Sequence, residues 1–199
     1  MFKTLLSRMT RRSPDLQRSS AVNSDMDNFP TMAMAAEMLT APSALMQLSM
    51  EEAQVVVRYM RPKRIAQGTI FIREGDTQDT NFMALVLEGD VIVETIVANR
   101  TSPITLTVLG PGSMHGELSL IDGLQRSASC TASSDLSCAI LTRKGMTQLL
   151  KNDPTVGAKL MMAIAMRIGD RLRDNTDKLK KFVQLTKTLQ QEVDELHRG

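Results

Sequence analysis

GELSLIDGLQRSAS, residues 116–129, is the stretch that decides the fold of this chain. Gly116 permits close approach of a backbone, and Glu117 can accept a hydrogen bond from a hydroxyl group. Glu117 also opens an apolar run of about one helical turn, whose free N–H groups point outward and suit an anion. Arg126 lies beyond the helix breaker Gly123 and brings a planar cation to the same place. The spacing therefore predicts a site for one ribose and one phosphate.

Each part of this stretch has a distinct chemical role. The guanidinium of Arg126 can give a phosphate charge-assisted hydrogen bonds with a defined geometry, which a lysine ammonium cannot match. Glu117 is expected to take the ribose 2′-hydroxyl. Either side chain alone would pass for an ordinary surface residue of a loop, but their joint spacing argues against that interpretation. The anion site is completed by the backbone N–H groups of Leu118, Ser119, Ser127 and Ala128.

Short apolar runs separated by glycine turns surround this stretch between residues 63 and 142. Turns are expected at Gly68, at Gly75-Asp76 and at Gly89-Asp90. Runs of this length and spacing are typical of an antiparallel sandwich or barrel. The sequence therefore predicts a mainly β fold with flanking helices.

The flanking segments have helical patterns. Ser49 and Glu52 fit a capping box at the start of a helix that we expect to run to Pro62. A second helix is expected at 144–151, followed by a break and restart at Asp153-Pro154, and a long helix from 155 to 199.

The long helix carries a heptad pattern over about four heptads. Its positions alternate by four and three residues: Ile168, Leu172, Asn175, Leu179, Phe182, Thr186, Leu189, Val193 and Leu196. We name these nine residues the seam. A helix this long would outrun a small barrel, so a coiled coil in a homodimer is favoured over packing on its own barrel.

Together these patterns closely resemble the cyclic nucleotide-binding domain family, as in catabolite-activator-type regulators and protein kinase A regulatory subunits. The resemblance rests on Gly116–Ser119, Gly123 and Arg126–Ser129, on the early hairpin 68–76 and on the glycine turn 87–91, and it covers roughly 43–180. It implies an antiparallel β jelly-roll barrel followed by a long C-terminal dimer helix, and a cyclic nucleotide as ligand.

In this family the long C-terminal helix recognises the base. Residues 171–179 resemble the helix in which a Thr-Ser pair, one residue from each subunit, meets the adenine amino group. Asn175 and Thr176 fall at that pair, and Arg171 is a neighbour over the base. Asn175 is explained equally well as a polar residue that sets the register of the seam. Ser127 stands where cGMP-selective domains commonly carry Thr, so cAMP is favoured over cGMP.

Three segments are expected. Residues 1–42 form an N-terminal extension, largely disordered, in which the Met-rich part after residue 32 either docks on the core or forms a contact surface. Residues 43–154 form the cyclic nucleotide-binding barrel with flanking helices, and residues 155–199 form the dimerisation helix.

Composition narrows the function classes. The formal net charge of +2 is too small for a dedicated nucleic-acid binder, and no apolar stretch approaches the roughly 20 residues of a membrane span. Only His115 and His197 could serve as imidazole ligands, so a metal enzyme of cupin type is a poor fit. Cys130 and Cys138 are expected to be reduced and buried. We therefore expect a cytoplasmic binding module without enzymatic activity, DNA contact or membrane contact.

Three functions remain open from the sequence. The favoured one is a cAMP-responsive dimeric sensor that acts on an unidentified protein effector. The second is a catabolite-activator-like transcription regulator cut off before its DNA-binding domain, since no helix-turn-helix follows the seam. The third is a sensor that keeps the fold but no longer binds nucleotide; the intact Glu117 and Arg126 argue against it.

Overall fold

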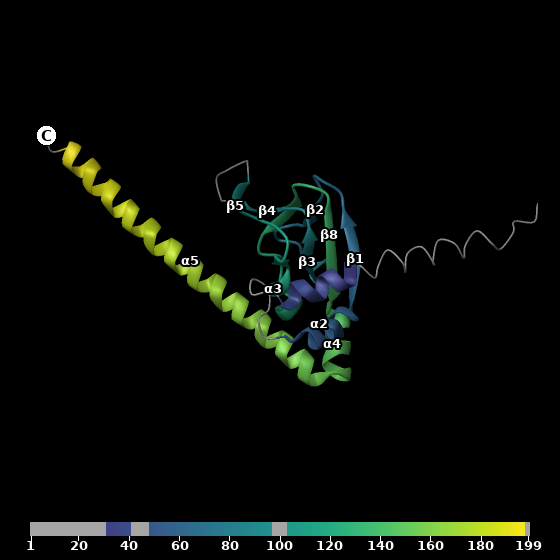
Figure 1. The fold of residues 1–199 in the computed structure, drawn as a ribbon. Helices are drawn as coiled ribbons and strands as arrows, with labels where there is room; N and C mark the ends of the chain where they lie inside the picture. Colours follow the sequence, from purple (N-terminus) through teal and green to yellow (C-terminus); the bar gives the residue numbers. More distant parts are fainter. Residues whose placement is uncertain (1–30, 41–47, 97–102, 198–199) are drawn as a thin grey trace, which may run out of the picture.

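The computed structural model describes residues 31–40, 48–96 and 103–197 of the chain (Figure 1). A helix occupies 31–40. The remaining elements are α2 (Met50–Val57), β1 (Met60–Ile65), β2 (Ile70–Ile72), β3 (Phe82–Glu88), β4 (Val91–Thr95), β5 (Ile104–Leu109), β6 (Met114–His115), α3 (Glu117–Asp122), β7 (Ser129–Ala132), β8 (Leu136–Thr142), α4 (Arg143–Asn152) and α5 (Pro154–Leu196).

The strands form two four-stranded sheets, in the orders β1-β8-β3-β6 and β2-β7-β4-β5. Every strand pairing is antiparallel. This confirms the predicted mainly β fold with flanking helices and a long C-terminal helix.

Strand β3 is buried on both faces and separates two apolar cores. Alternate residues point to opposite faces of a strand, and in β3 both sets are apolar. Met83, Leu85 and Leu87 face a core shared with the helices, whereas Phe82 and Val86 belong to a core enclosed by the two sheets. Three members of the second core, Ile72, Val93 and Cys130, also line the cavity at the predicted site.

Helix α2 is shorter than the sequence predicted. The expected capping box is present: Ser49 caps the backbone N–H of Glu52, and the Glu52 carboxylate accepts from the Ser49 N–H at 3.0 Å. The helix nevertheless ends at Val57, because Met60–Ile65 form strand β1 and pair with Leu136–Leu141 of β8. A proline inside a strand is tolerated at a sheet edge, where β1 lies.

The helix at 31–40 packs on the core through Ala35, Ala36 and Leu39, which are at most 2% exposed. This part of the N-terminal extension therefore docks on the core. The helix lies before the predicted domain boundary at residue 42, although it packs with the domain after it. The rest of the predicted extension, residues 1–30 and 41–42, lies outside the described residues.

The predicted break between two C-terminal helices is confirmed. Helix α4 ends at Asn152, and α5 begins at Pro154, where a proline loses no intrahelical hydrogen bond. Tyr59 ties this junction to the end of α2, since its hydroxyl donates to Asp153 at 2.8 Å. Figure 1 shows α5 running past the sheets and then projecting far beyond them.

Two further expectations concern the cysteines and membranes. Cys130 and Cys138 are both free and buried, as predicted. Within the described ranges, none of the helices combines the length and apolarity that crossing a membrane requires.

Candidate functional site

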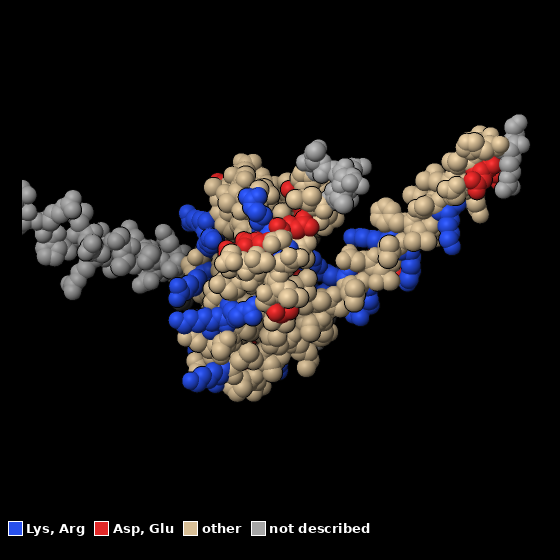
Figure 2. Space-filling view, turned by 180° about the vertical axis from the view of Figure 1, so that it is seen from behind, with Lys and Arg blue, Asp and Glu red and all other residues tan. Residues whose placement is uncertain are grey.

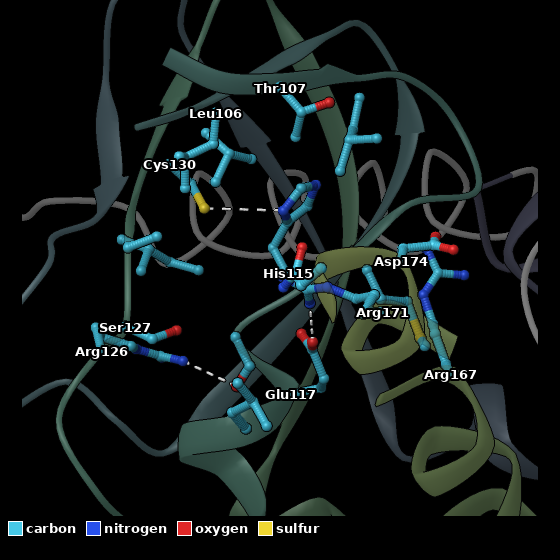
Figure 3. Close-up of a pocket in the computed structure, with 18 of the residues that line it drawn as sticks. Leu106, Thr107, His115, Glu117, Arg126, Ser127, Cys130, Arg167, Arg171 and Asp174 are labelled. Atoms are coloured by element: carbon cyan, nitrogen blue, oxygen red, sulfur yellow. Dashed lines mark hydrogen bonds and ion pairs between the residues drawn. The ribbon is translucent and has the colours of Figure 1, made fainter. Parts of the chain in front are cut away.

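A cavity of about 930 Å³ opens between the second sheet, α3 and the middle of α5 (Figure 3). Nine of the ten predicted site residues line it: Gly116, Glu117, Leu118, Ser119, Arg126, Ser127, Ala128, Arg171 and Asn175. They come from three separate segments of the chain, which the fold brings around one space. The sequence-predicted site residues are therefore assembled in one place.

Thr176 is the exception. It does not line the cavity, and its hydroxyl donates to the Leu172 carbonyl of its own helix at 2.8 Å. Its neighbour Asn175 does line the cavity, so only one of the two residues predicted to meet the base lies at this wall. Within one protomer Thr176 does not line this cavity, and its contact with the base stays a prediction.

Helix α3 is bounded by two glycines with left-handed backbone conformations. Gly116 has φ 84° and Gly123 has φ 74°. At Gly116 a side chain is also excluded by space, because a Cβ would collide with the Arg126 guanidinium and meet the Phe82 carbonyl at 3.0 Å. Glycine at 116 thus lets the backbone reach both the cavity and Arg126.

Arg126 is 2% exposed and held by three main-chain oxygens. Its Nε donates to the Asp79 carbonyl at 3.0 Å, and its two terminal nitrogens donate to the carbonyls of Gly116 at 2.9 Å and Phe82 at 3.0 Å. The guanidinium also lies 4.6 Å from the centre of the Phe82 ring. Burial lowers the pKa of Arg126, while nearby Asp79 opposes that shift. The guanidinium is therefore fixed in direction before any ligand arrives.

Glu117 is likewise 2% exposed, and its partner is Arg171 of α5 (Figure 3). Arg171 is half exposed, at 52% of its side chain. The hydrogen-bonded ion pair joins the first residue of α3 to the long C-terminal helix. The carboxylate predicted to bind ribose is thus also a contact between the cavity and α5.

The sequence interpretation missed Arg167, Asp174 and Lys178, which line the same cavity. They stand four residues before, three after and seven after Arg171, so they share one helix face with it. Extending the helical period from Arg171 would have found them. Burial lowers the pKa of Arg167, while the Glu117 carboxylate opposes that shift.

His115 and Cys130 are two further lining residues that the prediction left out. The sequence prediction considered His115 only as a metal ligand. In the described part of the chain, no group of three or more His, Cys, Asp or Glu side chains could hold a metal ion.

Comparisons with known proteins agree with this geometry. A family model of the cyclic nucleotide-binding domain matches residues 62–153. The cyclic AMP receptor protein of Thermus thermophilus is 31% identical over 124 residues, which are 62% of this chain and 56% of that protein. A cyclic nucleotide-gated potassium channel of Rhizobium etli is 29% identical over 114 residues, covering 57% of this chain and 30% of the channel.

Among solved structures, a cyclic nucleotide-binding domain from Methylobacillus flagellatus superimposes with a TM-score of 0.65 and 29% identity, covering 75% of this chain and 82% of that one. The chain spans just over half the length of the Thermus protein and about a third of the channel. These relatives are a receptor protein and a channel that share the domain. Residues 62–153, which supply Gly116–Ser119 and Arg126–Ala128 of the cavity wall, match the cyclic nucleotide-binding domain family.

Proposed function

We propose that this chain is a cytoplasmic cAMP sensor module, not an enzyme, which dimerises through α5 and passes ligand occupancy to an unidentified protein effector. One observation carries the ligand site. Glu117 and Arg126, each 2% exposed, meet at the same cavity beside Gly116 and Ser127. Two opposite charges buried beside an open cavity are matched to a ligand with a hydroxyl group and an anion.

The phosphate is proposed to bind Arg126 and the backbone around Ser127 and Ala128. A guanidinium has five N–H groups, and three of those on Arg126 donate to carbonyls. Two N–H groups are left for phosphate oxygens. Because the three carbonyls hold the side chain in place, little side-chain entropy is lost when the anion binds.

The ribose 2′-hydroxyl is proposed to bind Glu117. Since Glu117 already pairs with Arg171, a hydroxyl arriving there changes a contact between the site and α5. Ligand can move α5 only by binding its two arrangements with different affinity. The ion pair supplies such a difference, because the same carboxylate serves both partners.

The preference for cAMP rests on three features. Ser127 lacks the methyl-bearing hydroxyl side chain that cGMP-selective domains commonly use at this place. Asn175 lines the cavity from α5, where its amide can both donate to and accept from a purine edge. The Thermus relative carries cyclic AMP in its name.

The proposed homodimer rests on the seam. Leu172, Leu179 and Phe182 are 63–66% exposed, although they are large and apolar. A second copy of α5 would cover them, with Asn175 and Thr186 setting the register. Thr176 does not line the cavity of its own chain, and we propose that it contributes to the cavity of the partner subunit.

One observation favours a second candidate function, a sensor that has lost its nucleotide. Arg126 is engaged in fixing three carbonyls, and a purely structural arginine would look the same. This alternative predicts a stable fold with an empty site.

Calorimetric titration with cAMP, cGMP and cyclic di-GMP decides between the two. We expect cAMP to bind most tightly, and Arg126→Lys to weaken binding by at least about tenfold, because lysine lacks the fork of N–H groups. Arg173→Lys is the matched control, since Arg173 is exposed on α5 and pairs with Asp170. Absence of binding by all three nucleotides, or equal binding by a folded Arg126→Lys variant, contradicts the proposal. Light-scattering mass, with and without ligand, tests the dimer.

A further inference from the structure

One imidazole interrupts the apolar floor of the cavity. His115, at the end of β6, is 5% exposed and lines the cavity. Its ring stands edge-on to Phe71 with 6.4 Å between ring centres. The floor around it is otherwise aliphatic or sulfur-bearing: Ile72, Val93, Leu109, Ala128 and Cys130. A buried polar ring in such a floor needs partners for both nitrogens.

The two nitrogens have partners of unequal quality. Nε2 lies 3.0 Å from the Ser113 hydroxyl oxygen, a good hydrogen-bond distance. Nδ1 has only the Cys130 sulfur, at 3.8 Å (Figure 3). Burial raises the pKa of the Cys130 thiol to about 12, so the thiol stays protonated and is a weak donor. Nδ1 is therefore the poorly satisfied polar atom of the cavity.

The imidazole is neutral at neutral pH. Burial lowers the pKa of His115 to about 4, with Arg171 and Arg167 acting in the same direction. A neutral imidazole has one N–H donor and one bare acceptor nitrogen. If Nε2–H donates to Ser113, Nδ1 is the acceptor that faces the thiol.

The ligand offers few groups that could serve this acceptor. Phosphate oxygens carry no hydrogen at neutral pH, and the ribose hydroxyl is assigned to Glu117 by the proposed function on which this inference rests. The remaining donors are N–H groups of the base. In Figure 3 the imidazole extends beyond Glu117 toward Leu106 and Thr107 of β5, away from Arg126. That is the end of the cavity left for the base once the phosphate lies at Arg126.

We propose that Nδ1 of His115 accepts a hydrogen bond from the exocyclic amino group of the bound purine, replacing the Cys130 thiol as its partner. His115 is then a base-recognition residue on the floor of the cavity.

A double-mutant cycle between protein and ligand tests this contact. The ligands are cAMP and purine riboside 3′,5′-cyclic monophosphate, which lacks only the amino group. In the unaltered protein we expect loss of that group to weaken binding about fivefold, the range of one neutral hydrogen bond. In His115→Phe, which keeps a ring against Phe71, we expect less than about a twofold difference between the ligands.

Cys130→Ala is the matched control. It removes the competing thiol and leaves Nδ1 in place, so the preference for the amino-bearing ligand should persist. Loss of the preference in Cys130→Ala, or its persistence in a folded His115→Phe, overturns the assignment of Nδ1.

Nitrogen NMR of the imidazole gives a second readout that does not require substituting His115. The chain has two histidines, so His197→Gln leaves a single imidazole signal. We expect a protonated Nε2 and a bare Nδ1, and a shift of the Nδ1 resonance with cAMP that the des-amino ligand does not produce. A protonated Nδ1, or the same shift with both ligands, overturns the inference.

The two proposals fail in different ways. If neither nucleotide binds the unaltered protein, the proposed function fails and this inference fails with it. If both bind with equal affinity and binding still depends on Arg126, only the inference about His115 fails.

Discussion

The wall of the cavity and the outer half of α5 differ in which side chains are buried and which are exposed. At the cavity, the charged residues Glu117 and Arg126 are buried and find their partners within the same chain. On the outer half of α5, the apolar residues Leu189 and Leu196 are 52% and 82% exposed, and a single chain leaves them in contact with water.

A single chain satisfies the buried polar groups of the cavity wall, but it does not cover the apolar side chains on the outer half of α5. Among the described residues, no buried side-chain nitrogen or oxygen lacks a hydrogen-bond partner. Large apolar side chains aligned on one exposed face are normally covered in the working molecule. The contrast therefore predicts that changes at the cavity reduce the stability of the single chain, whereas changes at the seam affect association.

The largest effect on the cavity side is expected from Arg126→Ala. It removes the donors that satisfy the carbonyls of Asp79, Gly116 and Phe82. Leaving these buried carbonyls without partners should lower the free energy of unfolding by about 3–5 kcal/mol. Urea titration measures it, with Arg61→Ala on the exposed edge of β1 as control. A loss under about 1 kcal/mol would mean that water replaces the guanidinium and that the cavity wall is not completed by the chain.

At the seam, Leu189→Glu should weaken the dimer while leaving the folded protomer intact. Each dimer carries the change twice, at about 1.5–3 kcal/mol per side chain, so we expect at least about a hundredfold weaker association. Analytical ultracentrifugation measures the dissociation constant.

The matched control is Gln184→Glu, which adds the same charge to α5 at a position outside the seam. It should leave the dissociation constant within about a factor of two. Equal effects of the two substitutions would show that the seam is an ordinary solvated face and would remove the contrast.

Much of this contrast could be predicted from the sequence, because the cavity residues and the seam are both recognised by the spacing of residues that lie close together along the chain. Gly116, Glu117 and Arg126 lie close together along the chain, and the short helix between them has its own glycine boundaries. The seam is visible because a heptad repeat depends only on position along one helix. Patterns of this kind need no knowledge of long-range contacts.

The rest depended on contacts between distant segments. The end of α2 was predicted too late because pairing of β1 with β8 overrides the local helical pattern up to Pro62. The Arg171 contact with Glu117 joins residues 54 positions apart, and no spacing rule links them. The burial of His115 beside Cys130 was also invisible, since it results from two strands folding over one floor.

Lowering the pH should destabilise the cavity side of the molecule through protonation of His115. Folding lowers the pKa of His115 to about 4 from its ordinary 6.5. Between these two pH values the unfolded chain is protonated at His115 and the folded chain is not. Above pH 6.5 the imidazole is neutral in both states and does not reduce the free energy of unfolding. As the pH falls toward 4, protonation of the unfolded chain lowers that free energy, by about 2 kcal/mol at pH 5. Unfolding titrations at pH 7 and pH 5 should show this loss, and His115→Phe should remove it. An unchanged pH dependence in that variant would show that the imidazole is already solvated.

The smallest of these effects is expected where the two halves meet, at the Arg171–Glu117 pair. Arg171→Ala leaves a buried carboxylate without its hydrogen-bonded partner, whereas Arg173→Ala removes a pair in which both side chains are about 70% exposed. Because Arg171 is itself half exposed and the charge of Arg167 lies close to Glu117, the loss in unfolding free energy should be about 1–2 kcal/mol for Arg171→Ala. For Arg173→Ala it should be about 0–0.5 kcal/mol. Matched urea titrations of the two variants measure the difference. Equal losses would mean that Glu117 does not need α5, and ligand at the carboxylate would then have no direct contact through which to move that helix.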